Sequence, residues 1–153
     1  MTYNYKGDFM QLQIRKATIQ DAEQLSQLLS ELVYEPSNLS ALTKQLEKIA
    51  QTPHYQLTVA CDGDTIAGTA TGIVCWDTCG ACQNFLVIEN VVTAPAYRGK
   101  GVGRAIFHWL EDWARTQDCE YAILVSTHTR IDAHAFYREI GYTQECGFKK
   151  LLD

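Results

Sequence analysis

One stretch of sequence decides the fold: residues 84–104 read NFLVIENVVTAPAYRGKGVGR. Residues 84–93 are rich in Val, Ile and Leu, which favour a β-strand, and this strand has to end at Ala94-Pro95. Beyond the glycine-rich loop, apolar residues recur every three or four positions from Val102 to Trp113, which is the spacing of one helix face. The stretch therefore predicts a strand, a glycine loop and a helix in that order.

The loop itself is Arg98-Gly99-Lys100-Gly101-Val102-Gly103, and Arg104 follows it. Glycines allow tight turns, so several N–H groups can converge on one anion at the positive end of the helix dipole. A diphosphate would fit there, with Arg98, Lys100 and Arg104 adding positive charge. The alternative is a glycine-rich turn that binds nothing. The spacing matches neither the P-loop nor the dinucleotide G-x-G-x-x-G fingerprint.

Working outward from this loop, the remaining pattern predicts an α/β fold with a mixed sheet. Residues 1–10 show no clear period and are interpreted as a loosely ordered leader before a domain at 11–153. Thr18 and Asp21 resemble a capping box that opens a helix. Expected strands cover residues 11–16, 55–61, 65–76, 121–127 and 148–152, and further helices cover about 40–52 and 132–140.

Composition limits the function classes. The chain has 153 residues and a net charge of −5, which argues against a nucleic-acid footprint. It has no apolar run of 18 residues and no apolar leader, so we expect a cytoplasmic protein without membrane partners. Six cysteines are expected as free thiols in that compartment.

Three segments carry a family resemblance. Arg98-x-x-Gly101-x-Gly103 is similar to the R/Q-x-x-G-x-G/A signature of the GNAT (Gcn5-related N-acetyltransferase) superfamily. Residues 14–22 look like that family's first strand and helix, and residues 133–142 look like its late A-x-x-F-Y-x-x-x-G-F/Y segment. The resemblance covers residues 11–152. It implies one GNAT domain, with a mostly antiparallel mixed sheet of about six to seven strands, flanking helices and a splayed cofactor-binding strand pair.

The resemblance also implies a co-substrate, acetyl-CoA, and no metal. The pyrophosphate would contact residues 98–104, that is Arg98, Gly99, Lys100, Gly101, Val102, Gly103 and Arg104. Backbone groups of Val91, Val92 and Thr93 would pair with the pantetheine arm like an added strand. An N–H near Val92 would meet the oxyanion.

Glu89 is the candidate base for the acceptor amine. It is the lone acid in an apolar strand, and many GNAT members carry a catalytic Glu at this place. Because an amine with a pKa near 10.4 is protonated at neutral pH, a base helps acetyl transfer. The alternative role, orienting water, a neighbouring Arg or the amine without taking a proton, stays open.

Tyr137 is the candidate proton donor to the departing thiolate, since the family's Tyr at this place approaches the cofactor sulfur. The alternative is a core aromatic, because Ala133, Phe136, Tyr137 and Ile140 lie at helical spacing.

Two departures limit the transfer of family roles: Arg130 stands where many members have Asn, and Val125 stands where ribosomal-protein acetyltransferases have an acid. His128 and His134 receive no role.

Cys75-x3-Cys79-x2-Cys82 has the spacing of a radical-SAM loop, and three thiolates could also hold zinc. The domain is too short for a radical-SAM barrel, and no nearby Cys or His supplies a clean fourth ligand. We interpret the segment as a hairpin near the acceptor mouth.

The sequence therefore predicts an N-acetyltransferase that uses a primary amine acceptor in a ternary complex. We favour a small-molecule or amino-acid amine over a protein lysine. The competing hypothesis is a catalytically weak CoA-binding sensor or interaction module. A homodimer is common among relatives and is one assembly to expect.

Overall fold

The computed structural model describes residues 2–7 and 10–152, which divide into two compact units, Met1–Ile123 and Leu124–Asp153. The strands are β1 (Thr2–Gly7), β2 (Met10–Lys16), β3 (Tyr55–Asp62), β4 (Thr65–Cys75), β5 (Asn84–Thr93) and β6 (Cys119–Leu124). The helices are α1 (Ala22–Val33), α2 (Leu39–Ala50), α3 (Val102–Arg115) and α4 (Ile131–Glu139), with 3₁₀ turns η1 (Ile19–Asp21) and η2 (Pro95–Tyr97).

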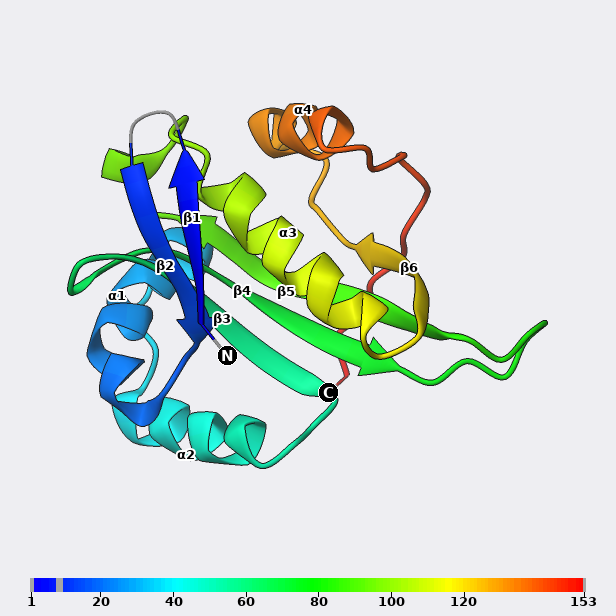
Figure 1. Ribbon diagram of the computed structural model, residues 1–153, viewed down its shortest axis with the longest axis horizontal. Coiled ribbons are helices and arrows are strands. Elements are labelled where there is room, and N and C mark those ends of the chain that lie inside the picture. Colours follow the sequence, from blue (N-terminus) through cyan, green and yellow to red (C-terminus); the bar gives the residue numbers. More distant parts are fainter. Residues whose placement is uncertain (1, 8–9, 153) are drawn as a thin grey trace. The chain divides into compact units, whose positions relative to one another are not determined.

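The first unit is built on a mixed sheet with the strand order β1-β2-β3-β4-β5-β6. Strands β1 to β5 pair antiparallel with their neighbours in the sequence. Helix α3 crosses one face of this sheet, and α1 and α2 contact the other face (Figure 1). This is the α/β architecture expected from the sequence.

Helix α3 lies very close to the centre of the sheet because β4 presents glycines beneath it. A Cβ atom added at Gly68 would lie 2.8 Å from Val102 Cγ1, and one added at Gly72 would lie 2.9 Å from Leu110 Cδ2. Val102 and Leu110 are at most 1% exposed. Gly68 therefore lets the start of α3 approach β4 closely, and Gly72 does the same for the second half of the helix.

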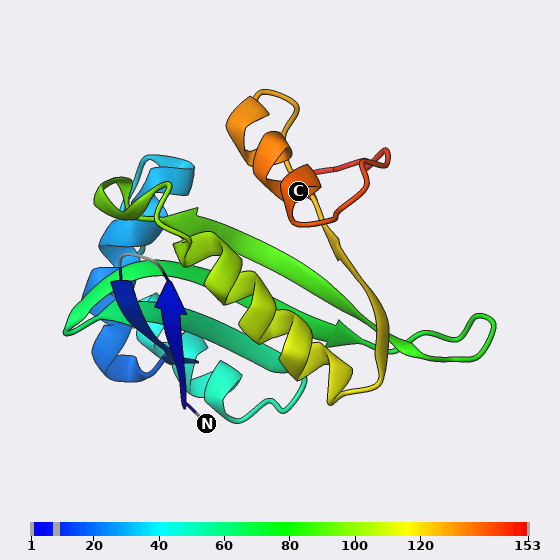
Figure 2. The same cartoon turned by 45° about the horizontal axis from the view of Figure 1, so that its top comes forward.

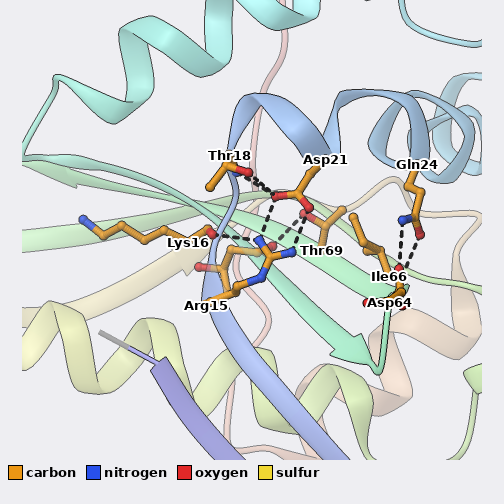
Figure 3. A network of polar contacts seen from close by, with 9 residues as sticks. Arg15, Lys16, Thr18, Asp21, Gln24, Asp64, Ile66 and Thr69 are labelled. Atoms are coloured by element: carbon orange, nitrogen blue, oxygen red, sulfur yellow. Dashed lines mark hydrogen bonds and ion pairs between the residues drawn. The ribbon is translucent and has the colours of Figure 1, made fainter.

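On the opposite face, α1 is anchored by a polar cluster (Figure 3). The Arg15 guanidinium donates to both carboxylate oxygens of Asp21, at 2.7 and 2.8 Å. Asp21 also accepts a hydrogen bond from the Thr18 backbone N–H at 2.7 Å, which is the carboxylate half of the predicted capping box. Gln24, one turn further along, bonds to the Asp64 carbonyl and the Ile66 N–H in the β3–β4 turn.

The prediction of a loosely ordered leader was wrong for residues 2–7. They form β1, which pairs with β2 from Thr2↔Arg15 to Gly7↔Met10. The alternation Thr2-Tyr3-Asn4-Tyr5 is a strand signal that the search for an apolar period overlooked. Asp8 and Phe9 lie outside the described residues, and the domain limits 11–153 stay a prediction.

The prediction of a last strand at residues 148–152 was also wrong. These residues have no regular secondary structure, and Phe148 and Leu152 are 96% and 91% exposed. A strand exists only when a neighbour pairs with its backbone, and an apolar pair of residues does not supply one. The other expected elements are confirmed, although β6 begins two residues before and ends three residues before the predicted strand 121–127.

Candidate functional site

The glycine loop at the start of α3 has the backbone conformation that the sequence suggested. Gly99 and Gly101 have φ values of +73° and +83°, in the left-handed region that favours glycine. Gly101 is the N-cap residue of α3, and the first helical hydrogen bond runs from Ala105 N–H to the Gly101 carbonyl at 3.0 Å. The N–H groups of Val102 and Gly103 precede that bond, as the first donors of every α-helix do. The loop thus presents N–H donors at the positive end of a 14-residue helix.

The loop is open in front of Gly99. A Cβ atom placed there would meet nothing within 4 Å among the described residues. Lys100 lies over the Tyr97 ring, with Nζ 5.6 Å from the ring centroid, and so stays beside the loop. The open side of Gly99 and a nearby cation therefore lie two residues or fewer before the N-cap of α3.

Arg98 is held by protein groups, which the sequence did not predict. Its Nη2 donates to Glu31 of α1 at 2.9 Å, and its Nε donates to the Thr93 carbonyl at 3.2 Å. These bonds tie the end of β5 to α1 across the start of the loop. Arg98 therefore orders the start of the loop, and the Glu31 carboxylate offsets part of its charge.

Strand β5 contains a β-bulge just before this loop. Thr69 pairs with Val92 and Thr71 pairs with Glu89, so Asn90 and Val91 together oppose the single residue Ala70. Asn90 has φ +53°, and asparagine is one of the residues that accept this conformation. The sequence analysis missed the bulge, although a polar Glu-Asn pair within an apolar strand was a signal for it. The bulge takes backbone groups around Val91 out of the β4–β5 ladder.

The other edge of β5 lies next to β6. The Phe85 ring stacks on Tyr121 of β6 with centroids 5.3 Å apart, which places the beginning of β5 against β6. Because β5 has ten residues and β6 has six, the end of β5 extends beyond β6. Val91, Val92 and Thr93 all lie in that extension.

Glu89 lies at the bulge and projects from the α1/α2 face of the sheet. It pairs with Thr71, which also pairs with Leu57, and residues paired in this way share a face. Leu57 belongs to the core that α1 and α2 cover, whereas the next residue, Ile88, pairs with Gly72 beneath α3. Glu89 is half-buried. Glu89, the bulge and the glycine loop therefore follow one another along the chain, from β5 to the start of α3.

A residue of the supposed leader also lies at this site. The Tyr5 hydroxyl is 3.6 Å from the position of a Cβ atom on Gly101. The sequence analysis missed Tyr5 because it gave residues 1–10 no structure. Its only sequence signal was the Tyr3, Tyr5 alternation.

Tyr137 lies in the second unit, on α4. It is 8% exposed, and its ring centroid lies 5.6 Å from that of Phe136 and 6.4 Å from that of Tyr142. Helix α4 ends as predicted, with Gly141 at φ +99° and the Tyr142 N–H donating to the Tyr137 carbonyl at 2.9 Å. Tyr137 is thus held in an aromatic cluster within its own unit.

The cysteine segment forms the loop between β4 and β5. Asp77 accepts a hydrogen bond from the Cys79 N–H at 2.9 Å, and the Cys82 N–H donates to the Cys79 carbonyl at 2.8 Å. All six cysteines are free thiols. Within the described ranges, no group of three His, Cys, Asp or Glu side chains is placed to hold a metal ion.

Taken together, a strand with a bulge, a left-handed glycine loop and a helix N-terminus define an α/β domain whose βα junction places backbone N–H donors at the start of a helix. The family model described as "Acetyltransferase (GNAT) family" matches residues 22–142. The chain belongs to this family of acyltransferases.

Known proteins agree with that assignment. A streptothricin acetyltransferase of Streptomyces lavendulae is 31% identical over 94 residues, which cover 61% of this chain and 46% of that protein. An aminoalkylphosphonate N-acetyltransferase of Salmonella typhimurium is 37% identical over 57 residues, which cover 37% of each chain. The aligned parts therefore span less than half the length of these two relatives.

The fold is also that of solved structures. A putative acetyltransferase from Agrobacterium tumefaciens superposes with a TM-score of 0.81 at 25% identity, over 92% of this chain and 99% of that one. None of the helices in the described residues is long and apolar enough to cross a membrane.

Proposed function

We propose that the protein is an N-acetyltransferase that transfers the acetyl group of acetyl-CoA to a primary amine by direct attack in a ternary complex. The observation that carries this proposal is the glycine loop at the N-terminus of α3. Gly99 and Gly101 adopt left-handed φ values there, and the space in front of Gly99 is open. A diphosphate fits such a place because backbone N–H groups and the helix dipole both favour negative charge.

The backbone of Val91, Val92 and Thr93 is our candidate for the pantetheine arm. This end of β5 lies after the bulge and beyond the end of β6. Backbone groups at such an edge can pair with the amides of an extended ligand, as an added strand would. An N–H near Val92 is then positioned to stabilise the oxyanion that develops on the thioester carbonyl.

Glu89 is our candidate for the group that receives the amine proton, directly or through water. It stands at the bulge, immediately before the proposed pantetheine segment. Once the amine is neutral, its nitrogen attacks the thioester carbonyl and the carbon–sulfur bond breaks. The attacking nitrogen then loses its second proton to water, and the departing thiolate gains one. We assign that proton to the Tyr137 hydroxyl, because a phenol is a suitable donor to a thiolate.

For the acceptor we propose an amine of a small molecule or amino acid. The relatives named above act on streptothricin and on aminoalkylphosphonates, according to their names. Glu89 projects from the sheet face that α1 and α2 cover, so these helices and the β4–β5 loop are the parts we expect to shape acceptor choice. A cytoplasmic location stays a prediction.

Calorimetric titration with acetyl-CoA, followed by a thiol-release screen of amines, tests the proposal. We expect saturable binding and turnover with at least one small amine. Tyr137→Phe should lower kcat about 100-fold and leave the Kd of acetyl-CoA within twofold, since a lost proton donor affects the chemical step. Tyr142→Phe, which alters a neighbouring ring of the same unit, is the control.

The outcomes separate the hypotheses. Binding without turnover on any amine would favour the sensor or interaction module. A Tyr137→Phe variant that loses binding and turnover equally would contradict the donor role. Absence of binding at millimolar acetyl-CoA would overturn the proposed function itself.

A further inference from the structure

Strand β1 places a row of tyrosine side chains along α3. Tyr3 pairs with Ile14 and Tyr5 pairs with Leu12 in the antiparallel β1–β2 ladder. Residues two apart in a strand project to the same face, so the two tyrosines point in one direction. The Tyr3 ring lies against Trp109 of α3, with centroids 6.4 Å apart. The row therefore faces the helix, and β1 runs beside α3 in both views (Figures 1 and 2).

Tyr5 is the member of this row that reaches the beginning of the helix. Its hydroxyl lies 3.6 Å, and its Cε1 3.9 Å, from the position of a Cβ atom on Gly101. Gly101 is the N-cap of α3. The phenolic oxygen therefore lies next to Gly101, the residue that directly precedes the helical N–H groups that we assign to the diphosphate. It does not fill the open space at Gly99, where a Cβ atom meets nothing within 4 Å.

On the basis of the proposed function, we infer that Tyr5 is a further coenzyme-binding residue. Its hydroxyl donates a hydrogen bond to the diphosphate held at the α3 N-terminus. Each non-bridging oxygen of a diphosphate can accept more than one hydrogen bond, so it can use a donor beyond those of the helix end, and hydrogen bonds to charged acceptors are stronger than neutral ones. A phenol supplies such a donor without adding a charge. In this chain, the N-terminal strand thus completes the cradle that the R-x-x-G-x-G loop begins.

The test compares Tyr5→Phe with Tyr3→Phe. Both variants remove one hydroxyl from the same strand and keep the ring, but only the first faces Gly101. We expect the Kd of acetyl-CoA, measured by calorimetry, to rise about tenfold in Tyr5→Phe and less than twofold in Tyr3→Phe. The apo melting temperatures should stay within about two degrees of the wild type, which shows that both variants fold.

A truncated substrate identifies the group that Tyr5 contacts. S-acetylpantetheine carries the thioester and the amides but no diphosphate. The Tyr5→Phe variant should therefore keep the wild-type kcat/KM with this substrate, within twofold, while its kcat/KM with acetyl-CoA falls. An equal loss with both substrates would mean that β1 packing, and not the diphosphate, was disturbed, and it would overturn the inference.

The remaining outcomes of the binding measurements also decide whether Tyr5 contacts the diphosphate. Equal affinities for acetyl-CoA in the wild type and both variants would refute the role of Tyr5 alone and leave the proposed function standing. Tighter binding by Tyr5→Phe would show that the hydroxyl obstructs the cradle. No binding by the wild type would overturn the proposed function, and this inference with it.

Discussion

Two polar regions of the first unit differ in where their hydrogen-bonding groups are directed. In the cluster around Asp21, the hydrogen-bonding groups pair with one another. Asp21 is 5% exposed, and its carboxylate accepts hydrogen bonds from the Arg15 guanidinium and the Thr18 backbone N–H. In the glycine loop, residues 98–100 are exposed, Gly101 and Gly103 are half-buried and Val102 is buried, and the loop ends at the N-terminus of α3, where the first helical N–H groups lie. The Asp21 cluster uses its hydrogen-bond donors within the protein, whereas the glycine loop leads to donors at a helix N-terminus.

This difference separates a structural polar site from our candidate binding site. A buried charge has to be paired, because an unpaired one costs several kcal/mol. Donors at an exposed helix end can be solvated at little cost and then exchanged for an anion. We therefore expect changes at Asp21 to alter stability and changes in the glycine loop to alter binding, and the predictions below test that separation.

The largest effect is expected for Gly101→Val. A β-branched residue is disfavoured at φ +83°, and the resulting shift of the loop removes about three donor contacts to the diphosphate. At roughly 1.5 kcal/mol for each bond, affinity for acetyl-CoA should fall on the order of 1,000-fold. Calorimetry measures this. Gly80→Val is the control, since Gly80 has φ +54° in open space in the β4–β5 loop, and it should lose stability but keep affinity for acetyl-CoA.

The next effect is on stability. Asp21→Ala leaves the Arg15 guanidinium without its carboxylate partner, and the free energy of unfolding should fall by about 2–3 kcal/mol, less than for a fully buried pair because Arg15 is 29% exposed. Urea denaturation measures the loss. Asp112→Ala removes an exposed Asp–Arg contact of similar length, 2.6 Å, and should cost less than about 0.5 kcal/mol. A large loss of acetyl-CoA affinity in folded Asp21→Ala would contradict the separation.

The smallest effect is a pH dependence of the same pair. Burial raises the pKa of Asp21, but hydrogen bonds from Arg15 and Thr18 and the Arg15 charge outweigh it, so the folded pKa lies below the ordinary value of 3.8. At a pH between the folded and the unfolded pKa of Asp21, the unfolded chain binds more protons than the folded one. The free energy of unfolding therefore falls as the pH drops below about 4. Urea midpoints from pH 7 to pH 3 should show this slope in the wild type. An equally steep slope in Asp21→Asn would assign it to other carboxylates.

Much of the first unit could be predicted because its signals are local. The capping pair Thr18 and Asp21 and the loop around Gly101 each specify backbone geometry within a few residues. The two wrong predictions concern strands at the chain ends. There the decision depended on a partner: residues 2–7 found β2, and residues 148–152 pair with no strand among the described residues.

The candidate site divides in the same way. The sequence by itself determined the glycine loop, the helix that follows it and the place of Glu89 in β5, because these follow from conformational preferences and from spacing along the chain. Only the tertiary structure decided the bulge at Asn90, the Arg98–Glu31 contact and the position of Tyr5 beside Gly101. The reason is physical: strand register and contacts between residues nearly a hundred positions apart arise from packing, which no local preference encodes.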